Sequence, residues 1–329
     1  MSENKNNDKN IVLQVEDLHT SFFTRKGEYK AVDGVSFHVD EGETLGIVGE
    51  SGCGKTVTGL SLLRLLPEPA GRIKAGKIIL DGTNLLELSK KEMRKMRGKE
   101  ISMILQDPMT SLNPLYTVGN QIAEPLRQHQ QLVGDRVEEE VISALRLLNI
   151  PAPEQRLRDY PHQLSGGMRQ RVVGAIGMSC NPRLLIADEP TTALDATIQA
   201  QYIALFKDVQ KKTNVSIIYI THDFSVVYQM CHRVAVMYAG KILETARTEV
   251  IFNNPTHPYT SALIKSVPRL DRKDDRLYSI KGHPPSLLNL PSGCRFYPRC
   301  PEAKNICRDK EPPETKIGDN HSVYCWGVN

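Results

Sequence analysis

One eight-residue segment carries the residue types that bind phosphate. It reads Gly49-Glu50-Ser51-Gly52-Cys53-Gly54-Lys55-Thr56 and matches the pattern G-x-x-x-x-G-K-[S/T]. Glycines let successive backbone N–H groups turn toward phosphate oxygens, while Lys55 can reach the β- and γ-phosphates and Thr56 can offer its hydroxyl to Mg²⁺. A chance glycine turn is the alternative. A strand-like run at 44–48 before the segment and a helical pattern at 56–66 after it favour a nucleotide-binding loop, called the phosphate loop below.

Two adjacent carboxylates form a second group that could do chemistry. Asp188 and Glu189 follow the apolar run at 184–187, so they should lie at the carboxyl edge of a parallel sheet, where α/β proteins bind ligands. Asp188 could hold Mg²⁺ through water, and Glu189 could orient or deprotonate a water that attacks a γ-phosphate. A solvated acidic turn is the alternative, which the phosphate loop upstream disfavours.

The pattern along the chain predicts an α/β fold in which a parallel sheet is flanked by helices. Apolar runs at 184–187, 215–220 and 234–238 alternate with helical patterns at 196–212 and 223–231. Apolar alternation at 11–15, 31–39 and 77–81, with glycines between, predicts short strands and turns. A helical insertion is expected at about 89–178. Prolines crowd beyond 255. We therefore expect a polar, disordered tip at 1–10, an ATPase domain at 11–250 and a C-terminal extension at 251–329.

Composition narrows the class of protein. The 329 residues are 40% hydrophobic, and 42 basic against 38 acidic residues give a net charge of +4, a balance that does not favour a nucleic-acid partner. No run approaches the roughly 18 apolar residues of a membrane helix. Residues 1–10 lack the apolar stretch of a secretory signal. We therefore expect a cytoplasmic chain with reduced thiols.

A glycine-containing segment brings in a family resemblance. Leu164-Ser165-Gly166-Gly167-Met168, called the signature segment below, resembles the signature motif of ABC-transporter ATPases. Ser165 and the amides of Gly166 and Gly167 would begin a helix and could donate hydrogen bonds to a phosphate. The resemblance implies that this phosphate belongs to ATP bound by the opposite subunit. It also implies the ABC ATPase fold, in which a parallel-sheet core carries an antiparallel β subdomain and a helical subdomain.

The same resemblance assigns roles to further single residues. Gln106 would be the Q-loop residue that reaches Mg²⁺ and contacts the membrane subunits. Asp195 would be the D-loop residue, and His222 the switch histidine near the γ-phosphate. Phe22 would stack on adenine, with Phe23 and Tyr29 as competitors.

The end of the chain indicates a subfamily. Residues 253–263, which include His257-Pro258-Tyr259-Thr260, resemble the C-terminal extension of ATPase subunits of dipeptide and oligopeptide permeases, and most closely of their D-type subunits. The same subfamily includes nickel importers. The resemblance implies an import motor at the cytoplasmic face of the membrane. Its partners would be a second ATPase subunit of the same or a homologous kind, two membrane permease subunits and an extracytoplasmic peptide-binding protein.

A non-transport ABC ATPase that acts on DNA or ribosomes is the alternative from another class. Such proteins usually carry two cassettes or a long coiled-coil insertion. The sequence has neither feature.

Four cysteines gather in the extension with the spacing C-x₅-C-x₆-C-x₁₇-C: Cys294, Cys300, Cys307 and Cys325. The paired C-x₂-C spacing usual for structural zinc is absent from this set, whereas four thiolates can ligate a [4Fe–4S] cluster. The resemblance to D-type subunits implies such a cluster. A zinc site and free or disulfide-forming cysteines are the alternatives.

Overall fold

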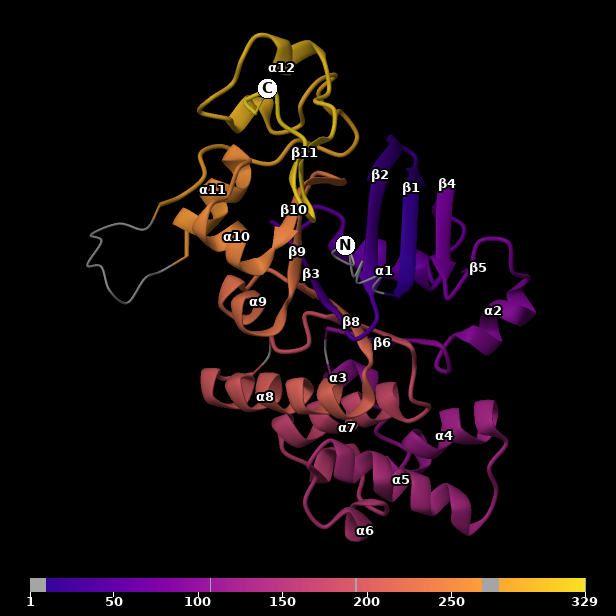
Figure 1. Ribbon diagram of the computed structural model, residues 1–329. Helices are drawn as coiled ribbons and strands as arrows, with labels where there is room; N and C mark the ends of the chain where they lie inside the picture. Colours follow the sequence, from indigo (N-terminus) through magenta and orange to yellow (C-terminus); the bar gives the residue numbers. More distant parts are fainter. Residues whose placement is uncertain (1–9, 107, 193, 268–277, 329) are drawn as a thin grey trace, which may run out of the picture. The chain divides into compact units, whose positions relative to one another are not determined.

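The computed structural model describes residues 10–106, 108–192, 194–267 and 278–328, with the backbone alone at 108 and 109 (Figure 1). Most of the tip predicted at 1–10 therefore lies outside the described residues. The chain divides into two compact units, each built from three stretches of sequence. The first unit contains Met1–Val15, Phe37–Glu43 and Ile78–Ile218, and the second contains Glu16–Ser36, Thr44–Lys77 and Tyr219–Asn329.

Helices dominate the first unit. They are α2 (Lys90–Met96), α3 (Pro108–Ser111), α4 (Val118–Gln130), α5 (Asp135–Leu147), α6 (Pro153–Arg156), the 3₁₀ turn η1 (Pro161–Gln163), α7 (Gly166–Met178) and α8 (Ala196–Thr213). Helix α4 buries Val118, Ile122 and Leu126, spaced four residues apart, so one apolar stripe faces its neighbours. Helices α4 and α5 pack on each other and on α7. The predicted helical insertion at 89–178 contains α2 to α7.

Two parallel strands position the carboxylates of this unit. Strand β6 (Ile101–Ile104) pairs with β7 (Leu184–Asp188) in register from Ile101 opposite Leu184 to Ile104 opposite Ala187. Strand β7 is buried throughout, as expected for a strand covered on both faces. The carboxyl ends of both strands lie at the same edge, so residues that follow them become neighbours.

The second unit contains the strand that leads into the phosphate loop and the strands that continue its sheet. Strand β3 (Thr44–Val48) lies parallel to β9 (Arg233–Tyr238), which pairs antiparallel with β10 (Lys241–Arg247). The end of the chain adds β12 (His321–Val323) to β10 and β11 (Thr315–Gly318) to β12 (Figure 1). Its helices are α1 (Lys55–Leu62), α9 (Phe224–Met230), α10 (Thr248–Asn253), α11 (Pro258–Lys265), the 3₁₀ turn η2 (Tyr297–Arg299) and α12 (Ile306–Asp309).

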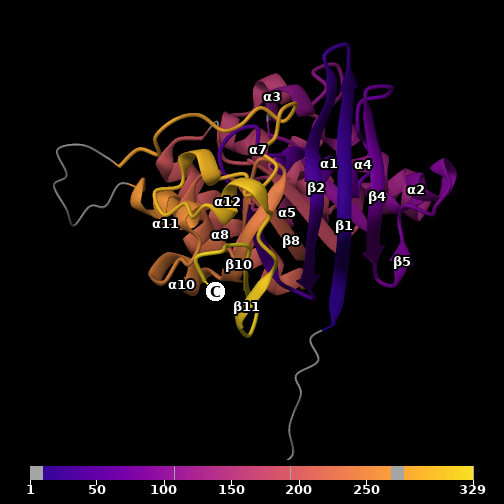
Figure 2. The same cartoon turned by 90° about the horizontal axis from the view of Figure 1, so that it is seen from above.

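Some strands have residues in both units. Strand β8 (Ser216–Thr221) is one of them. Four strands form a sheet of their own, in the order β2-β1-β4-β5. Figure 2 shows the long strands β2, β1 and β4 side by side. Its bounds are β1 (Ile11–Thr24), β2 (Gly27–Asp40), β4 (Gly71–Leu80) and β5 (Thr83–Asn84).

The predicted α/β class is confirmed, and the strand runs expected around 44–48, 184–187, 215–220 and 234–238 become β3, β7, β8 and β9. Helix α1 ends at Leu62, earlier than its helical pattern, because Arg64 takes a positive φ of 52°. Strands β11 and β12 were missed. Among the described residues, none of the helices combines the length and the apolar character needed to cross a bilayer.

Candidate nucleotide site

The phosphate loop joins β3 to α1 in the second unit, as the sequence predicts. The Lys55 ammonium is buried and donates to the carbonyl oxygens of Gly49 at 2.8 Å and Glu50 at 3.2 Å. Gly54 has a φ of 109°, and a Cβ there would come within 2.3 Å of the Ala31 carbonyl oxygen. Only glycine fits this position. Gly54 directly precedes α1, and the first backbone N–H groups of that helix point out of its start without partners in the helix.

The residues of the loop differ in exposure. Ser51, Gly52 and Thr56 are exposed, whereas Cys53 is buried. Burial raises the pKa of the Cys53 thiol and outweighs the nearby Lys55 cation. The thiol is therefore held in its neutral form, while Ser51, Gly52 and Thr56 are open to solvent.

Glu50 has partners that the sequence did not reveal. Its backbone N–H donates to the Tyr259 hydroxyl at 3.0 Å, and its carboxylate accepts two hydrogen bonds from Arg299. Both partners lie more than 200 positions away in the C-terminal extension. In the sequence, the motif that contains Tyr259 indicates a subfamily but no contact with the phosphate loop.

Phe22, the predicted adenine-stacking residue, lies on β1. Thr20, two residues earlier and therefore on the same face of the strand, shares a hydrogen bond with Ser61 of α1 at 2.9 Å. Phe22 thus lies on the face of β1 turned toward α1. The ring of Phe23, 37% exposed, has the Lys74 ammonium 5.2 Å from its centroid. Stacking of Phe22 on adenine stays a prediction.

His222 follows β8 directly and is exposed. The next residue, Asp223, caps α9 by accepting a hydrogen bond from the Ser225 N–H at 2.9 Å. His222 is therefore held between the end of a buried strand and a capped helix. Its predicted switch role stays a prediction.

In the first unit, two of the predicted residues meet. Asp188 is 2% exposed at the end of β7. Glu189 has a φ of 45°, and its Oε2 accepts hydrogen bonds from Gln106 Nε2 at 2.9 Å and Thr192 Oγ1 at 3.2 Å. The sequence predicted roles for Gln106 and Glu189 but not their contact. The parallel pairing of β6 with β7 brings them together.

The signature segment lies at the start of α7. Ser165 caps this helix, with its hydroxyl accepting from the Met168 N–H at 3.3 Å, and both Ser165 and Gly166 are exposed. Asp195 caps α8, accepting from two backbone N–H groups at 3.0 Å each. The two helix starts lie close together, since a Cβ on Gly167 would be 3.1 Å from the Ile198 side chain.

The four cysteines of the extension line one pocket, together with His257, Tyr297 and Trp326. Burial raises the pKa of Cys294 to about 11 and also raises those of Cys300 and Cys325. Among the described residues, however, no group of three or more His, Cys, Asp or Glu side chains is arranged to hold a metal ion. The [4Fe–4S] cluster that the resemblance implied is therefore not confirmed.

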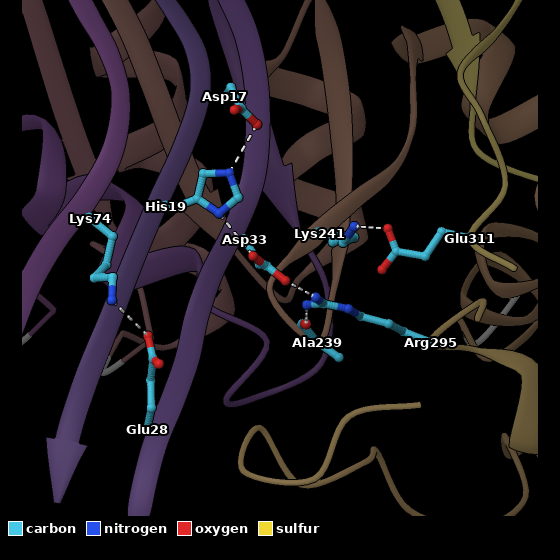
Figure 3. A network of polar contacts seen from close by, with 9 residues as sticks. All are labelled: Asp17, His19, Glu28, Asp33, Lys74, Ala239, Lys241, Arg295 and Glu311. Carbon is cyan, nitrogen blue, oxygen red and sulfur yellow. Dashed lines mark hydrogen bonds and ion pairs between the residues drawn. The ribbon is translucent and has the colours of Figure 1, made fainter. Parts of the chain in front are cut away.

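Further ion pairs tie the extension to the strands of the second unit (Figure 3). Arg295 pairs with Asp33 on β2 and donates to the Ala239 carbonyl oxygen, and His19 bridges Asp33 and Asp17 at 2.9 and 3.0 Å. Burial of Asp33 raises the carboxyl pKa, but Arg295 and the His19 hydrogen bond outweigh it, so the pKa is lowered. Lys241 on β10 also pairs with Glu311.

Comparison with known proteins decides the family. Residues 32–192 match the ABC transporter family, and residues 243–307 match the C-terminal region of oligopeptide/dipeptide transporters. The chain is 52% identical over 315 residues to the dipeptide transport ATP-binding protein DppD of Bacillus subtilis (strain 168), covering 96% of this chain and 94% of that one. The chain belongs to the ABC transporter ATPases. The predicted family is confirmed.

Other ABC proteins agree in sequence and fold. The oligopeptide transport ATP-binding protein OppD of B. subtilis is 51% identical, covering 96% of this chain and 88% of its own. The ADP- and phosphate-bound dimer of the ATP-binding cassette MJ0796 shares the fold, with a TM-score of 0.64 over 72% of this chain and 98% of that one, at 24% identity. The ABC family match contains the phosphate loop, Gln106, the signature segment and both carboxylates but ends before Asp195 and His222.

Proposed function

We propose that this chain is the ATP-hydrolysing subunit of an importer for dipeptides or oligopeptides. The observation that carries the proposal is the near full-length identity of about half the residues to two peptide-transport ATP-binding proteins. The match to the C-terminal region of oligopeptide/dipeptide transporters supports the same subfamily. Every residue that ABC chemistry requires is present in the sequence.

Each unit has its own part in the reaction. The phosphate loop binds the β- and γ-phosphates of ATP through Lys55 and the backbone N–H groups at the start of α1. Thr56, Asp188 and Gln106 would hold Mg²⁺, which supplies charge neutralisation at the phosphates. Glu189 acts as general base on the attacking water, and Gln106 and Thr192 orient its carboxylate.

The remaining predicted residues act in nucleotide binding and in assembly. Ser165, Gly166 and Gly167 donate to the γ-phosphate of ATP on a second ATPase subunit, near Asp195. His222 senses the γ-phosphate, and Phe22 stacks on adenine. The partners are that second subunit and two membrane permease subunits, which place this chain at the cytoplasmic face of the membrane and receive peptide from an extracytoplasmic binding protein.

Uptake in cells tests the substrate class. Cells that lack this chain should regain uptake of a labelled dipeptide with the wild-type chain but not with Lys55→Ala, because the substitution removes the cation that binds the phosphates. Glu154→Gln, which removes an exposed pair with Arg146, is the matched control and should restore uptake. Restoration of labelled nickel uptake without peptide uptake would replace the peptide proposal with a nickel importer.

For the cysteine pocket, the proposed occupant is a [4Fe–4S] cluster ligated by Cys294, Cys300, Cys307 and Cys325. Four thiols around one pocket fit such a cluster in donor type, and ligation would require their deprotonation and closer approach. Protein purified without oxygen should contain about four iron and four sulfide per chain, and Cys300→Ala should lose them. One zinc without sulfide, or no metal, would contradict this proposal without affecting that of ATP hydrolysis.

A further inference from the structure

The ion pair between Arg299 and Glu50 links the C-terminal extension to the phosphate loop inside the second unit. Arg299 Nη1 and Nη2 donate to the two carboxylate oxygens of Glu50 at 2.7 and 2.9 Å. These two nearly equal bonds form the bidentate arrangement that the planar guanidinium makes best with a carboxylate. The residues are 249 positions apart, so the fold, and not local sequence, creates the pair.

Arg299 is held in place on several sides. Its side chain is only 4% exposed, and it also donates to the Lys281 carbonyl oxygen at 3.0 Å and the Tyr238 hydroxyl at 3.3 Å. The pKa of this guanidinium is raised, chiefly by its hydrogen bonds to Glu50. Burial alone would lower the pKa, but its effect is smaller. A buried cation held by fixed acceptors can fix the position of the carboxylate it binds.

The backbone of Glu50 is fixed by the same region of the extension. Its N–H donates to the Tyr259 hydroxyl at 3.0 Å, and its carbonyl oxygen accepts from Lys55 Nζ at 3.2 Å. Tyr259 packs against Phe296, three residues before Arg299, with ring centroids 5.2 Å apart. The side chain, N–H and carbonyl of one loop residue are thus all restrained, and the last of these bonds involves the phosphate-binding lysine.

We infer that Arg299 is a positioning residue of the nucleotide site: through Glu50 it holds the phosphate loop in the shape that presents Lys55 and the loop amides to ATP. The inference deepens the proposed function and rests on it. Since the second bond of the pair requires the guanidinium fork, lysine should not replace Arg299 fully. The extension is then part of the ATP site and not only a tether.

Nucleotide binding by the full-length chain tests the inference. With a fluorescent ATP analogue and Mg²⁺, Arg299→Met should raise the Kd at least ~10-fold, since a buried charge-assisted pair is lost. Arg299→Lys should raise it several-fold, and Glu50→Ala should match Arg299→Met. The double variant should bind no more than about twofold more weakly than the weaker single variant, because both changes remove one interaction.

Lys241→Met is the matched control, because the pair of Lys241 with Glu311 also ties the extension to a core strand but lies outside the phosphate loop. Its Kd should stay within about twofold of wild type. If Arg299→Met does not fold, as judged by circular dichroism, Arg299→Lys and Glu50→Ala decide the question. Wild-type affinity in either, additive effects in the double variant, or equal weakening by Lys241→Met would overturn the inference. Loss of ATP binding by the wild-type chain would instead overturn the proposed function.

Discussion

The phosphate loop and the signature segment are both predicted to bind phosphate, yet the chain builds them differently. In the phosphate loop, the Lys55 ammonium is buried against carbonyl oxygens and Glu50 is restrained by Tyr259 and Arg299. In the signature segment, Ser165 and Gly166 are exposed, and the Ser165 hydroxyl caps its own helix. The chain itself fixes the shape of the first, whereas the second presents a helix start to solvent.

The two segments should differ in how much conformational entropy they lose when a phosphate binds. A loop held by its own chain is preorganised, so little conformational entropy is lost when a phosphate binds. An exposed helix start has free space for a ligand and a favourable dipole, but little in the described part of the first unit encloses it. This fits the proposal that a second subunit provides the ATP that the signature segment contacts.

The largest expected difference concerns one glycine from each segment. Gly54→Ala should lower the free energy of unfolding by at least ~3 kcal/mol, because the methyl group would overlap the Ala31 carbonyl oxygen at a positive φ. Gly166→Ala should leave the free energy of unfolding unchanged or raise it by up to ~1 kcal/mol. A Cβ at this position would meet no described atom within 4 Å outside its chain neighbours and the nearby helix backbone, and alanine favours the helix. Urea unfolding of both variants measures the change in the free energy of unfolding. Equal losses of stability in the two variants would contradict the difference between the phosphate loop and the signature segment.

A smaller effect on stability, combined with an effect on turnover, is expected at Ser165. Ser165→Ala removes the cap of α7 and should lower the free energy of unfolding by ~1 kcal/mol. It should also lower ATP turnover of the assembled transporter at least ~10-fold through loss of a phosphate donor. Ser89→Ala removes an equivalent cap from α2 and should reproduce only the loss of stability. Unchanged turnover with Ser165→Ala would leave Ser165 as a helix cap.

A further expected effect is a pH dependence at the Arg295–Asp33 pair (Figure 3). Because the folded pKa of Asp33 is lowered, its stabilisation is present above the unfolded pKa of ~4 and is lost as pH falls through the folded value. Asp33→Asn should therefore cost ~1–2 kcal/mol at pH 7 and flatten the acid limb of the stability curve.

Glu28→Gln, which breaks the more exposed pair with Lys74, should change stability by less than ~0.5 kcal/mol. Thermal unfolding between pH 3 and 7 compares the two variants. An acid limb with the wild-type slope in Asp33→Asn would contradict the role given to this carboxylate.

Local sequence was enough to predict the elements around the site. The run at 44–48, the glycines after it and the helical pattern that follows specify β3, the phosphate loop and α1 because their preferences are short-range. The apolar run at 184–187 likewise predicts β7 and places Asp188 at its end. Those patterns repeat within ten residues and therefore can be recognised in one sequence.

Contacts between distant segments could not be predicted in this way. The bond from Gln106 to Glu189 depends on the register of β6 with β7, and the pair of Arg299 with Glu50 joins residues 249 positions apart. Strand β12 is three residues long, too short for a periodic signal. In the cysteine-rich extension, the family resemblance implied that the four thiols share one site, but ligand geometry depends on loops whose conformation no periodic pattern specifies.

The most direct test of the central claim is ATP turnover by Glu189→Gln. The amide keeps the shape of the side chain but cannot accept a proton, so steady-state hydrolysis by the assembled transporter should fall at least ~10²-fold while ATP affinity stays within about twofold. The variant should accumulate as an ATP-bound dimer, and Glu154→Gln should hydrolyse ATP normally. Wild-type hydrolysis by Glu189→Gln would contradict the account.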